Sequence, residues 1–192
     1  MPKVALLLTD GFADWEYALI AGTGGPFYGL EVGFFAPAAG NLRSQGGLQV
    51  QVPSGFDEVQ VWQPDVVVVV GGMIWESGNA LDISEMLAAL KRLGVAVAGI
   101  CGGTLALARA GLLEDVRHTS NDQGFLIKNA AGYGGSAHFE DTPSAVSDRA
   151  VITAPGTAPV SFAAEVFRAA GVEPAAVTQF TTMLAAEHGS GV

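Results

Sequence analysis

The segment Gly99-Ile100-Cys101-Gly102-Gly103 has the G-x-nucleophile-x-G spacing of a nucleophile elbow, with cysteine in the position of the nucleophile. An apolar stretch precedes it and a helical stretch follows, so the cysteine falls at a strand-to-helix turn. Glycines flank it because the turn is too tight for side chains, and they hold the thiol in a strained, exposed conformation. The amides and dipole at the start of the helix are expected to lower the pKa of Cys101. The alternative is that Cys101 is a small buried hydrophobic residue beside a glycine turn.

A second group with acid–base chemistry, Glu16, lies early in an otherwise apolar helical segment that follows the first expected strand. Open α/β sheets bind ligands in the crevice beyond the carboxyl ends of their strands, so Glu16 is expected beside Cys101. A carboxyl next to a thiolate should have a raised pKa, stay protonated and donate a hydrogen bond to sulfur. The alternative is a solvated residue favoured by the dipole at the helix N-terminus.

Alternating strands and helices are expected to position these two groups. The expected strands are Val4 to Leu8, Glu31 to Ala36, Val66 to Val70, Val95 to Ile100 and Val151 to Thr153. The expected helices are one capped by Asp14 and stopped by Gly22 to Pro26, then Ser84 to Arg92, Thr104 to Ala110, Val160 to Ala170 and one opened by Pro174. With a short β-hairpin around Ser44 to Val52, this order predicts a single α/β domain over residues 1–192, with a mostly parallel sheet covered on both faces.

Composition narrows the classes of function. Of the 192 residues, 49% are hydrophobic and 15% are charged, which excludes intrinsic disorder. The formal net charge of −10 disfavours nucleic acid and anionic membrane surfaces as partners. No apolar block approaches the roughly 20 residues of a membrane helix. The single cysteine cannot form an internal disulfide, and nothing marks export, so a cytoplasmic location is expected.

Four motifs in register resemble the ThiJ/PfpI (DJ-one) superfamily. They are Asp10-Gly11-Phe12-Ala13-Asp14-Trp15-Glu16, the strand ending in Gly71-Gly72, the elbow Gly99–Gly103, and Thr153-Ala154-Pro155-Gly156-Thr157. The resemblance runs from Lys3 to about Ala170. It implies a flavodoxin-like three-layer sandwich, shared with class I glutamine amidotransferases, and a homodimer, which is common among relatives.

The resemblance also implies roles for particular residues. It assigns Glu16 to the acid that contacts the elbow cysteine, and Gly71-Gly72 to a diglycine whose amide binds an oxyanion together with the amide of Gly102. Amides aimed at developing negative charge stabilise it without reorganisation. The diglycine is alternatively a plain strand-ending turn. Trp75 is a candidate either for a wall of the pocket or for a core aromatic residue.

The third catalytic position departs from the family pattern. Many relatives place a histidine directly after the cysteine or on the next short strand, whereas here a glycine follows the cysteine and Asn121 aligns with the later position. His118 lies three residues earlier, and because an odd offset on a strand reverses the face, it is expected to point away from the thiol. Asn121 and His118 are therefore candidate pocket residues only. His138 and His188 are expected in surface or packing roles.

These features predict a cysteine-dependent enzyme for small electrophilic carbonyls, comparable to the glyoxalase or deglycase chemistry found in parts of the superfamily, within a stress response. The alternative is a non-enzymatic stress protein, chaperone-like or redox-sensing, in which Cys101 is oxidised reversibly. Peptidase or amidase activity is disfavoured because it needs a general base for the leaving group. The expected partners are a small-molecule substrate and a second copy of the chain. No ligand cluster has metal spacing, and no metal or cofactor is expected.

Overall fold

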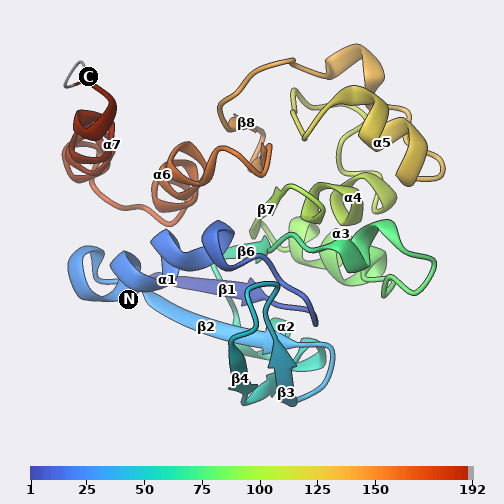
Figure 1. Ribbon diagram of the computed structural model, residues 1–192, viewed down its shortest axis with the longest axis horizontal. Coiled ribbons are helices and arrows are strands. Elements are labelled where there is room, and N and C mark those ends of the chain that lie inside the picture. Colours follow the sequence, from blue (N-terminus) through green and yellow to red (C-terminus); the bar gives the residue numbers. More distant parts are fainter. Residues whose placement is uncertain (190–192) are drawn as a thin grey trace.

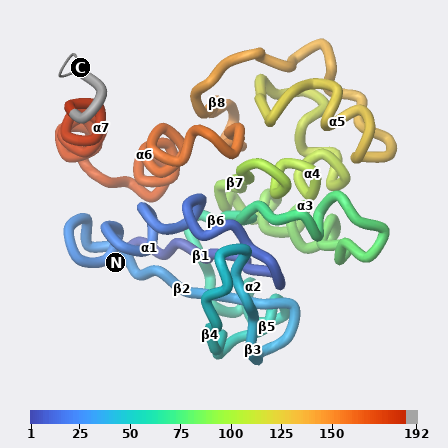
Figure 2. Tube along the Cα trace, viewed as in Figure 1, coloured from blue at the N-terminus to red at the C-terminus, as the bar shows by residue number. Residues whose placement is uncertain are grey.

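The computed structural model describes residues 1–189 (Figures 1 and 2). Its strands are β1 (Lys3–Leu7), β2 (Glu31–Ala36), β3 (Gly40–Arg43), β4 (Gln49–Val52), β5 (Ser54–Gly55), β6 (Val66–Val69), β7 (Ala96–Ile100), β8 (Val146–Asp148) and β9 (Val151–Ala154). Its α-helices are α1 (Asp14–Tyr28), α2 (Val59–Trp62), α3 (Ser84–Arg92), α4 (Gly103–Arg109), α5 (Gln123–Asn129), α6 (Pro159–Ala169) and α7 (Pro174–Gly189). Three short 3-10 helices, η1 (Phe56–Glu58), η2 (Met73–Glu76) and η3 (Gly135–His138), lie in the connections.

The central sheet has the strand order β5-β2-β1-β6-β7-β9-β8. All neighbouring strands are parallel except β8, which runs antiparallel to β9. The run β2-β1-β6-β7-β9 has the 2-1-3-4-5 order of flavodoxin-like folds, in which ligands bind beyond the carboxyl ends of the strands near the reversal of strand order. The predicted flavodoxin-like fold is therefore confirmed, and the reversal lies between β1 and β6.

Helices cover both faces of this sheet. One face packs against α1 and α6, with α7 packed on α6; the three helices lie together on one side in Figure 1 and contribute Ile20, Phe162, Phe167 and Phe180. The other face packs against α3 and α4, with α5 packed on α4, and these helices contribute Leu87, Leu105 and Leu126. The two apolar layers fix the positions of the strand ends, and with them the positions of the functional side chains that follow those ends.

The valine run that forms and follows β6 shows why the sheet is buried on both sides. Val66, Val68 and Val70 belong to the apolar layer under α1 and α6, whereas Val67 and Val69 belong to the opposite layer. All five side chains are fully buried. Because alternate residues of a strand face opposite sides, only a strand covered on both faces reads as a continuous β-branched run.

Helix α1 differs from its prediction at both ends. It continues through Pro26 to Tyr28 and ends at Gly29, which has a left-handed φ of 66°. The glycines predicted to stop it pack instead: a Cβ on Gly24 would lie 3.3 Å from Val32 Cγ2, so the glycine allows close helix–sheet contact. Tertiary packing thus overrides the low helix propensity of this segment. Asp14 is the first helical residue and not the N-cap, which is Ala13; the carboxylate of Asp14 accepts the backbone N–H of Gly46 instead.

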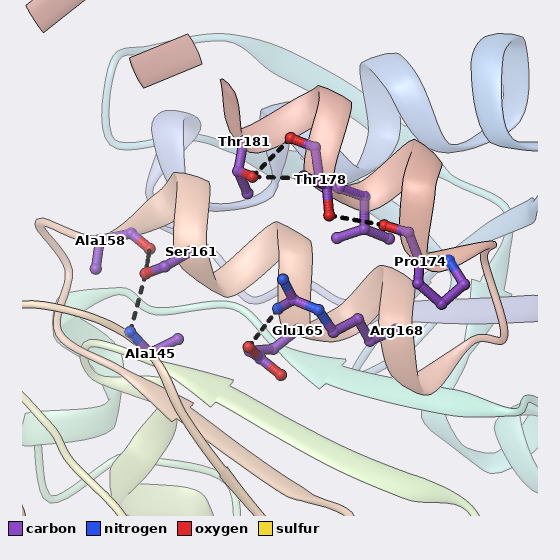
Figure 3. Close-up of polar contacts among 9 residues, drawn as sticks. Ala145, Ala158, Ser161, Glu165, Arg168, Pro174, Thr178 and Thr181 are labelled. Atoms are coloured by element: carbon purple, nitrogen blue, oxygen red, sulfur yellow. Dashed lines mark hydrogen bonds and ion pairs between the residues drawn. The ribbon is translucent and has the colours of Figure 1, made fainter. Parts of the chain in front are cut away.

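Figure 3 shows polar contacts made by residues of α6 and α7. Ser161 Oγ accepts the backbone N–H of Ala145 at 2.9 Å, which ties α6 to the segment leading into β8. On α7, Thr178 donates its hydroxyl to the carbonyl of Pro174, four residues earlier, at 2.9 Å. The Thr178 bond lies within α7 and satisfies a hydroxyl on a helix whose apolar side packs against α6.

The remaining elements mostly match the predictions. Helix α3 spans the predicted residues, and β3 and β4 form the predicted hairpin. Helix α5 was not predicted, although Asp122 caps it by accepting the N–H of Phe125 at 2.8 Å. None of the helices within residues 1–189 combines the length and apolar character needed to cross a membrane.

Candidate active site

Cys101 occupies a strained turn between β7 and α4. Its φ of 52° lies in the left-handed region, where a residue with a side chain is strained. The turn is held because Cys101 N donates to Ala154 O at 2.9 Å and the hydroxyl of Thr104 donates to Cys101 O at 2.6 Å. Thr104 Oγ1 and Ser120 Oγ lie 2.7 Å apart, which anchors this hydroxyl in turn. The expected nucleophile elbow is therefore present, and its thiol is half-buried.

The glycine beside the nucleophile is required by a close approach of backbone. A Cβ on Gly102 would lie 2.7 Å from Gly72 O, 3.3 Å from Gly72 N and 3.3 Å from Trp75 Cδ1. The diglycine after β6 and the elbow after β7 are thus in contact, as the oxyanion assignment requires. Trp75 is fully buried and donates its indole N–H to Val70 O at 3.0 Å. It is a core aromatic residue beneath the turn rather than an open pocket wall.

Glu16 projects from the first turn of α1 toward the contact between the diglycine and the cysteine elbow. Only 1% of the residue is exposed, and Oε2 accepts the backbone N–H of Gly71 at 2.7 Å. The other oxygen, Oε1, is buried without a hydrogen-bond partner among the described residues. Oε1 and the sulfur of Cys101 both face Gly156, because a Cβ there would lie 3.3 Å and 3.0 Å from them respectively. If Oε1 carries a proton, the nearby sulfur is its acceptor.

Glu16 and Cys101 titrate as a coupled pair. Burial raises the pKa of Glu16 to about 7, against the lowering effects of its hydrogen bond from Gly71 and of the nearby Cys101 thiol. Burial, and then the charge of Glu16, raise the pKa of Cys101 to about 11, although Asn121 and the Gly102 amide lower it. The pair therefore carries a single negative charge between about pH 7 and pH 11. The lowered pKa predicted for Cys101 is wrong, because burial and a second charge outweigh the donors at the turn.

Asn121 lies at the sulfur, at the position where the alignment places it. Its Nδ2 donates to Cys101 Sγ at 3.3 Å, and its Oδ1 accepts the backbone N–H of Gly156 at 3.0 Å. The carbonyl of Gly156 accepts the indole N–H of Trp15 at 2.9 Å. Trp15, which is 48% exposed, forms part of the rim of the site.

Trp15 and Gly156 are the site residues that sequence reasoning missed. Both lie within motifs that support the family resemblance, one beside Glu16 and the other after β9. Their contact joins residues 141 positions apart, so no local pattern could have paired them.

The histidines lie away from the sulfur. His118 is fully buried, with Nδ1 2.8 Å from Val116 O and Nε2 2.6 Å from Tyr133 Oη. Burial lowers the pKa of His118, which disfavours the charged ring. His138 ends η3 with an exposed side chain, and the side chain of His188 falls outside the described part of the chain. Within the described residues, no cluster of His, Cys, Asp or Glu could hold a metal ion.

A flavodoxin-like sheet with a cysteine at the strand-to-helix turn after β7 and a buried acid at its carboxyl edge defines a class of open α/β proteins. The model of the DJ-1/PfpI family matches residues 2–169, and the chain belongs to that family.

One curated sequence and two solved structures illustrate what the chain resembles. It is 33% identical over 173 residues to the uncharacterized protease YoaZ of Bacillus subtilis, covering 86% of this chain and 82% of that protein. The crystal structure of the DJ-1 superfamily protein Atu0886 from Agrobacterium tumefaciens is 38% identical, with a TM-score of 0.91, and covers 98% of this chain and 100% of that one. A thiJ/pfpI family protein from Bacillus anthracis is 31% identical, with a TM-score of 0.85, and covers 94% and 89%.

Proposed function

We propose that the protein is a cysteine-dependent enzyme that acts on small electrophilic carbonyls, of which an α-oxoaldehyde is the simplest. The observation that carries the proposal is the buried, unpartnered Oε1 of Glu16 beside the sulfur of Cys101. A carboxyl whose pKa is raised to about 7 can both give and take a proton near neutral pH.

The proposed reaction starts with a carbon–sulfur bond. The thiolate of Cys101 attacks the aldehyde carbon, and the carbonyl electron pair moves to oxygen, where the amides of Gly72 and Gly102 hold the charge. Glu16 protonates this oxygen to complete a hemithioacetal. The resulting carboxylate takes the proton from the former aldehyde carbon, which gives an enediolate, and returns it to the neighbouring carbon. The hydroxyl proton on the former aldehyde oxygen passes to the former ketone oxygen, so that the product is a thioester of a 2-hydroxy acid. Water then cleaves the thioester, which releases a 2-hydroxy acid and the thiol, so that the net reaction adds one water.

Amide hydrolysis fits this arrangement less well, although the Bacillus subtilis relative carries a protease name. A peptidase of this kind needs a histidine that accepts the thiol proton and protonates the leaving amine. His118 is engaged with Val116 and Tyr133 instead, and Asn121 stands at the sulfur.

Methylglyoxal turnover by the wild type and by Cys101→Ala tests the proposal. We expect conversion to lactate by the wild type and none by the variant. Wild-type turnover equal to that of Cys101→Ala would refute an enzymatic role for the cysteine.

A redox-sensing role is the second candidate, because two hydrogen-bond donors, Asn121 and the Gly102 amide, already face the sulfur. Such donors would also stabilise the oxygens of an oxidised cysteine. Intact mass after mild peroxide, compared between the wild type and Cys101→Ala, tests this role. We further propose a cytoplasmic homodimer, for which light scattering of the purified chain gives the mass.

A further inference from the structure

The amide of Asn121 has only one orientation that satisfies its surroundings. The backbone N–H of Gly156 is a donor, 3.0 Å from the side chain, so the amide oxygen must face it. The amide nitrogen is thereby directed at Cys101 Sγ, 3.3 Å away. Asn121 is consequently a donor toward sulfur and has no lone pair there with which to accept a proton.

The backbone that fixes this orientation is itself held on both sides. The carbonyl of Gly156 accepts the indole N–H of Trp15 at 2.9 Å. On the inner side, Gly156 lies so close to the pair that a Cβ would come within 3.0 Å of Cys101 Sγ. The Gly156 N–H is therefore held in a fixed position, and it fixes the orientation of the Asn121 side chain.

The charged groups around the sulfur do not favour its thiolate form. Glu16 is the charged group that acts on Cys101 among the described residues. The carboxylates of Asp14 and Asp122 accept backbone N–H groups at 2.8 Å, from Gly46 and Phe125 respectively. No cation among the described residues acts on Cys101, so hydrogen-bond donors are the groups that favour its thiolate: the Asn121 amide and the Gly102 N–H both face sulfur.

We propose that Asn121, oriented by the backbone of Gly156, is a catalytic hydrogen-bond donor that stabilises the thiolate of Cys101 against the charge of Glu16. The proposal rests on Cys101 as the nucleophile of the proposed function, but it concerns the free enzyme and does not require carbonyl turnover.

Alkylation by iodoacetamide tests the proposal directly, because the sulfur displaces iodide only as the thiolate. Asn121→Asp keeps an acceptor for Gly156 and replaces the donor with a negative charge. We expect alkylation at pH 7 to slow roughly 10- to 100-fold, the usual effect of losing a hydrogen bond to a charged group. Asn121→Ala, which adds no charge, should slow it by about tenfold and move the pH profile upward.

Asn129→Asp is the matched control. Asn129 also donates its Nδ2 to one acceptor, the carbonyl of Phe125 at 3.0 Å, but this bond lies within α5. We expect its alkylation profile to overlay that of the wild type. Profiles of Asn121→Asp and Asn121→Ala that also overlay the wild type would overturn the proposal, and so would an equal slowing in Asn129→Asp. Slowed alkylation in an enzyme without methylglyoxal turnover would support this inference while refuting the proposed function.

Discussion

Two buried polar clusters lie close together along the chain, one around Cys101 and one around His118, and they differ in how completely their atoms are paired. Both ring nitrogens of His118 have partners, at 2.8 Å on Val116 and 2.6 Å on Tyr133. In the other cluster, Oε1 of Glu16 is buried without one.

This difference separates a structural polar group from a reactive one. A buried group with every hydrogen bond made contributes to stability and has little reason to change its protonation state. A buried carboxyl with an orphaned oxygen is costly in its charged form, which is why the pKa of Glu16 rises. Burial alone therefore does not indicate function, and neither does residue type.

The strongest test of the contrast removes the carboxyl. Glu16→Gln eliminates the second charge of the pair, so Cys101 should titrate in one step, about 1–3 pH units below the value near 11. The wild type should show a further rise in alkylation rate near pH 11 that the variant lacks. Rates of iodoacetamide alkylation from pH 5 to 11 give both profiles. Superimposable profiles would show that Glu16 does not act on the sulfur.

The same variant should change how stability depends on pH. The pKa of Glu16 is raised from 4.5 to about 7 by folding, so its contribution to stability is full below pH 4.5 and is lost as pH rises through 7. The loss corresponds to about 3 kcal/mol, as an upper limit. Urea unfolding at pH 4.5 and 7.5 should show Glu16→Gln gaining stability relative to the wild type at the higher pH. A constant difference would contradict the raised pKa.

Closing the space beside the pair should impair chemistry with less effect on folding. A Cβ on Gly156 would press on the sulfur of Cys101, at 3.0 Å, and on Oε1 of Glu16, at 3.3 Å. Misplacement of reacting groups by about 1 Å can cost about 100-fold, so Gly156→Ala should reduce kcat/KM for methylglyoxal by about that factor. Gly22→Ala is the control, because a Cβ there meets nothing within 4 Å.

Substitutions in the His118 cluster, whose ring nitrogens are both hydrogen-bonded, should instead reduce stability and leave activity nearly unchanged. His118→Ala removes a buried ring and leaves Tyr133 Oη without its partner, which should cost about 2–3 kcal/mol of stability. Because the ring makes no contact with Cys101, kcat/KM should stay within a few-fold of the wild type. A loss beyond about 100-fold in the folded variant would restore histidine as a general base and favour a hydrolase.

The smallest effect is expected for Tyr133→Phe, which deletes one hydroxyl from the paired cluster. Loss of its bond to His118 should lower the free energy of unfolding by about 1 kcal/mol. Alkylation of Cys101 should be unaffected at any pH. A changed profile would mean that the two clusters are coupled.

The features that could be predicted from the sequence are those that local residue patterns determine. The elbow around Cys101 is encoded within five residues, and the valine run of β6 predicts a strand buried on both faces. The continuation of α1 through Pro26 depends on packing, which no periodicity reveals. The direction in which the pKa of Cys101 moves depends on burial, and therefore on the assembled fold.

The bond between Trp15 and Gly156 has a consequence for biosynthesis. Synthesis proceeds from the N-terminus, so the cysteine and the acid leave the ribosome well before the segment after β9 that completes their surroundings. A chain that ends before Gly156 lacks both the carbonyl that accepts the Trp15 indole N–H and the N–H that orients Asn121. The Ala154 carbonyl, which anchors the cysteine turn, lies only two residues earlier. Contacts of such long sequence separation form late, because chain entropy must be lost before they form. The surroundings of Cys101 therefore cannot be complete until the segment after β9 has been synthesised.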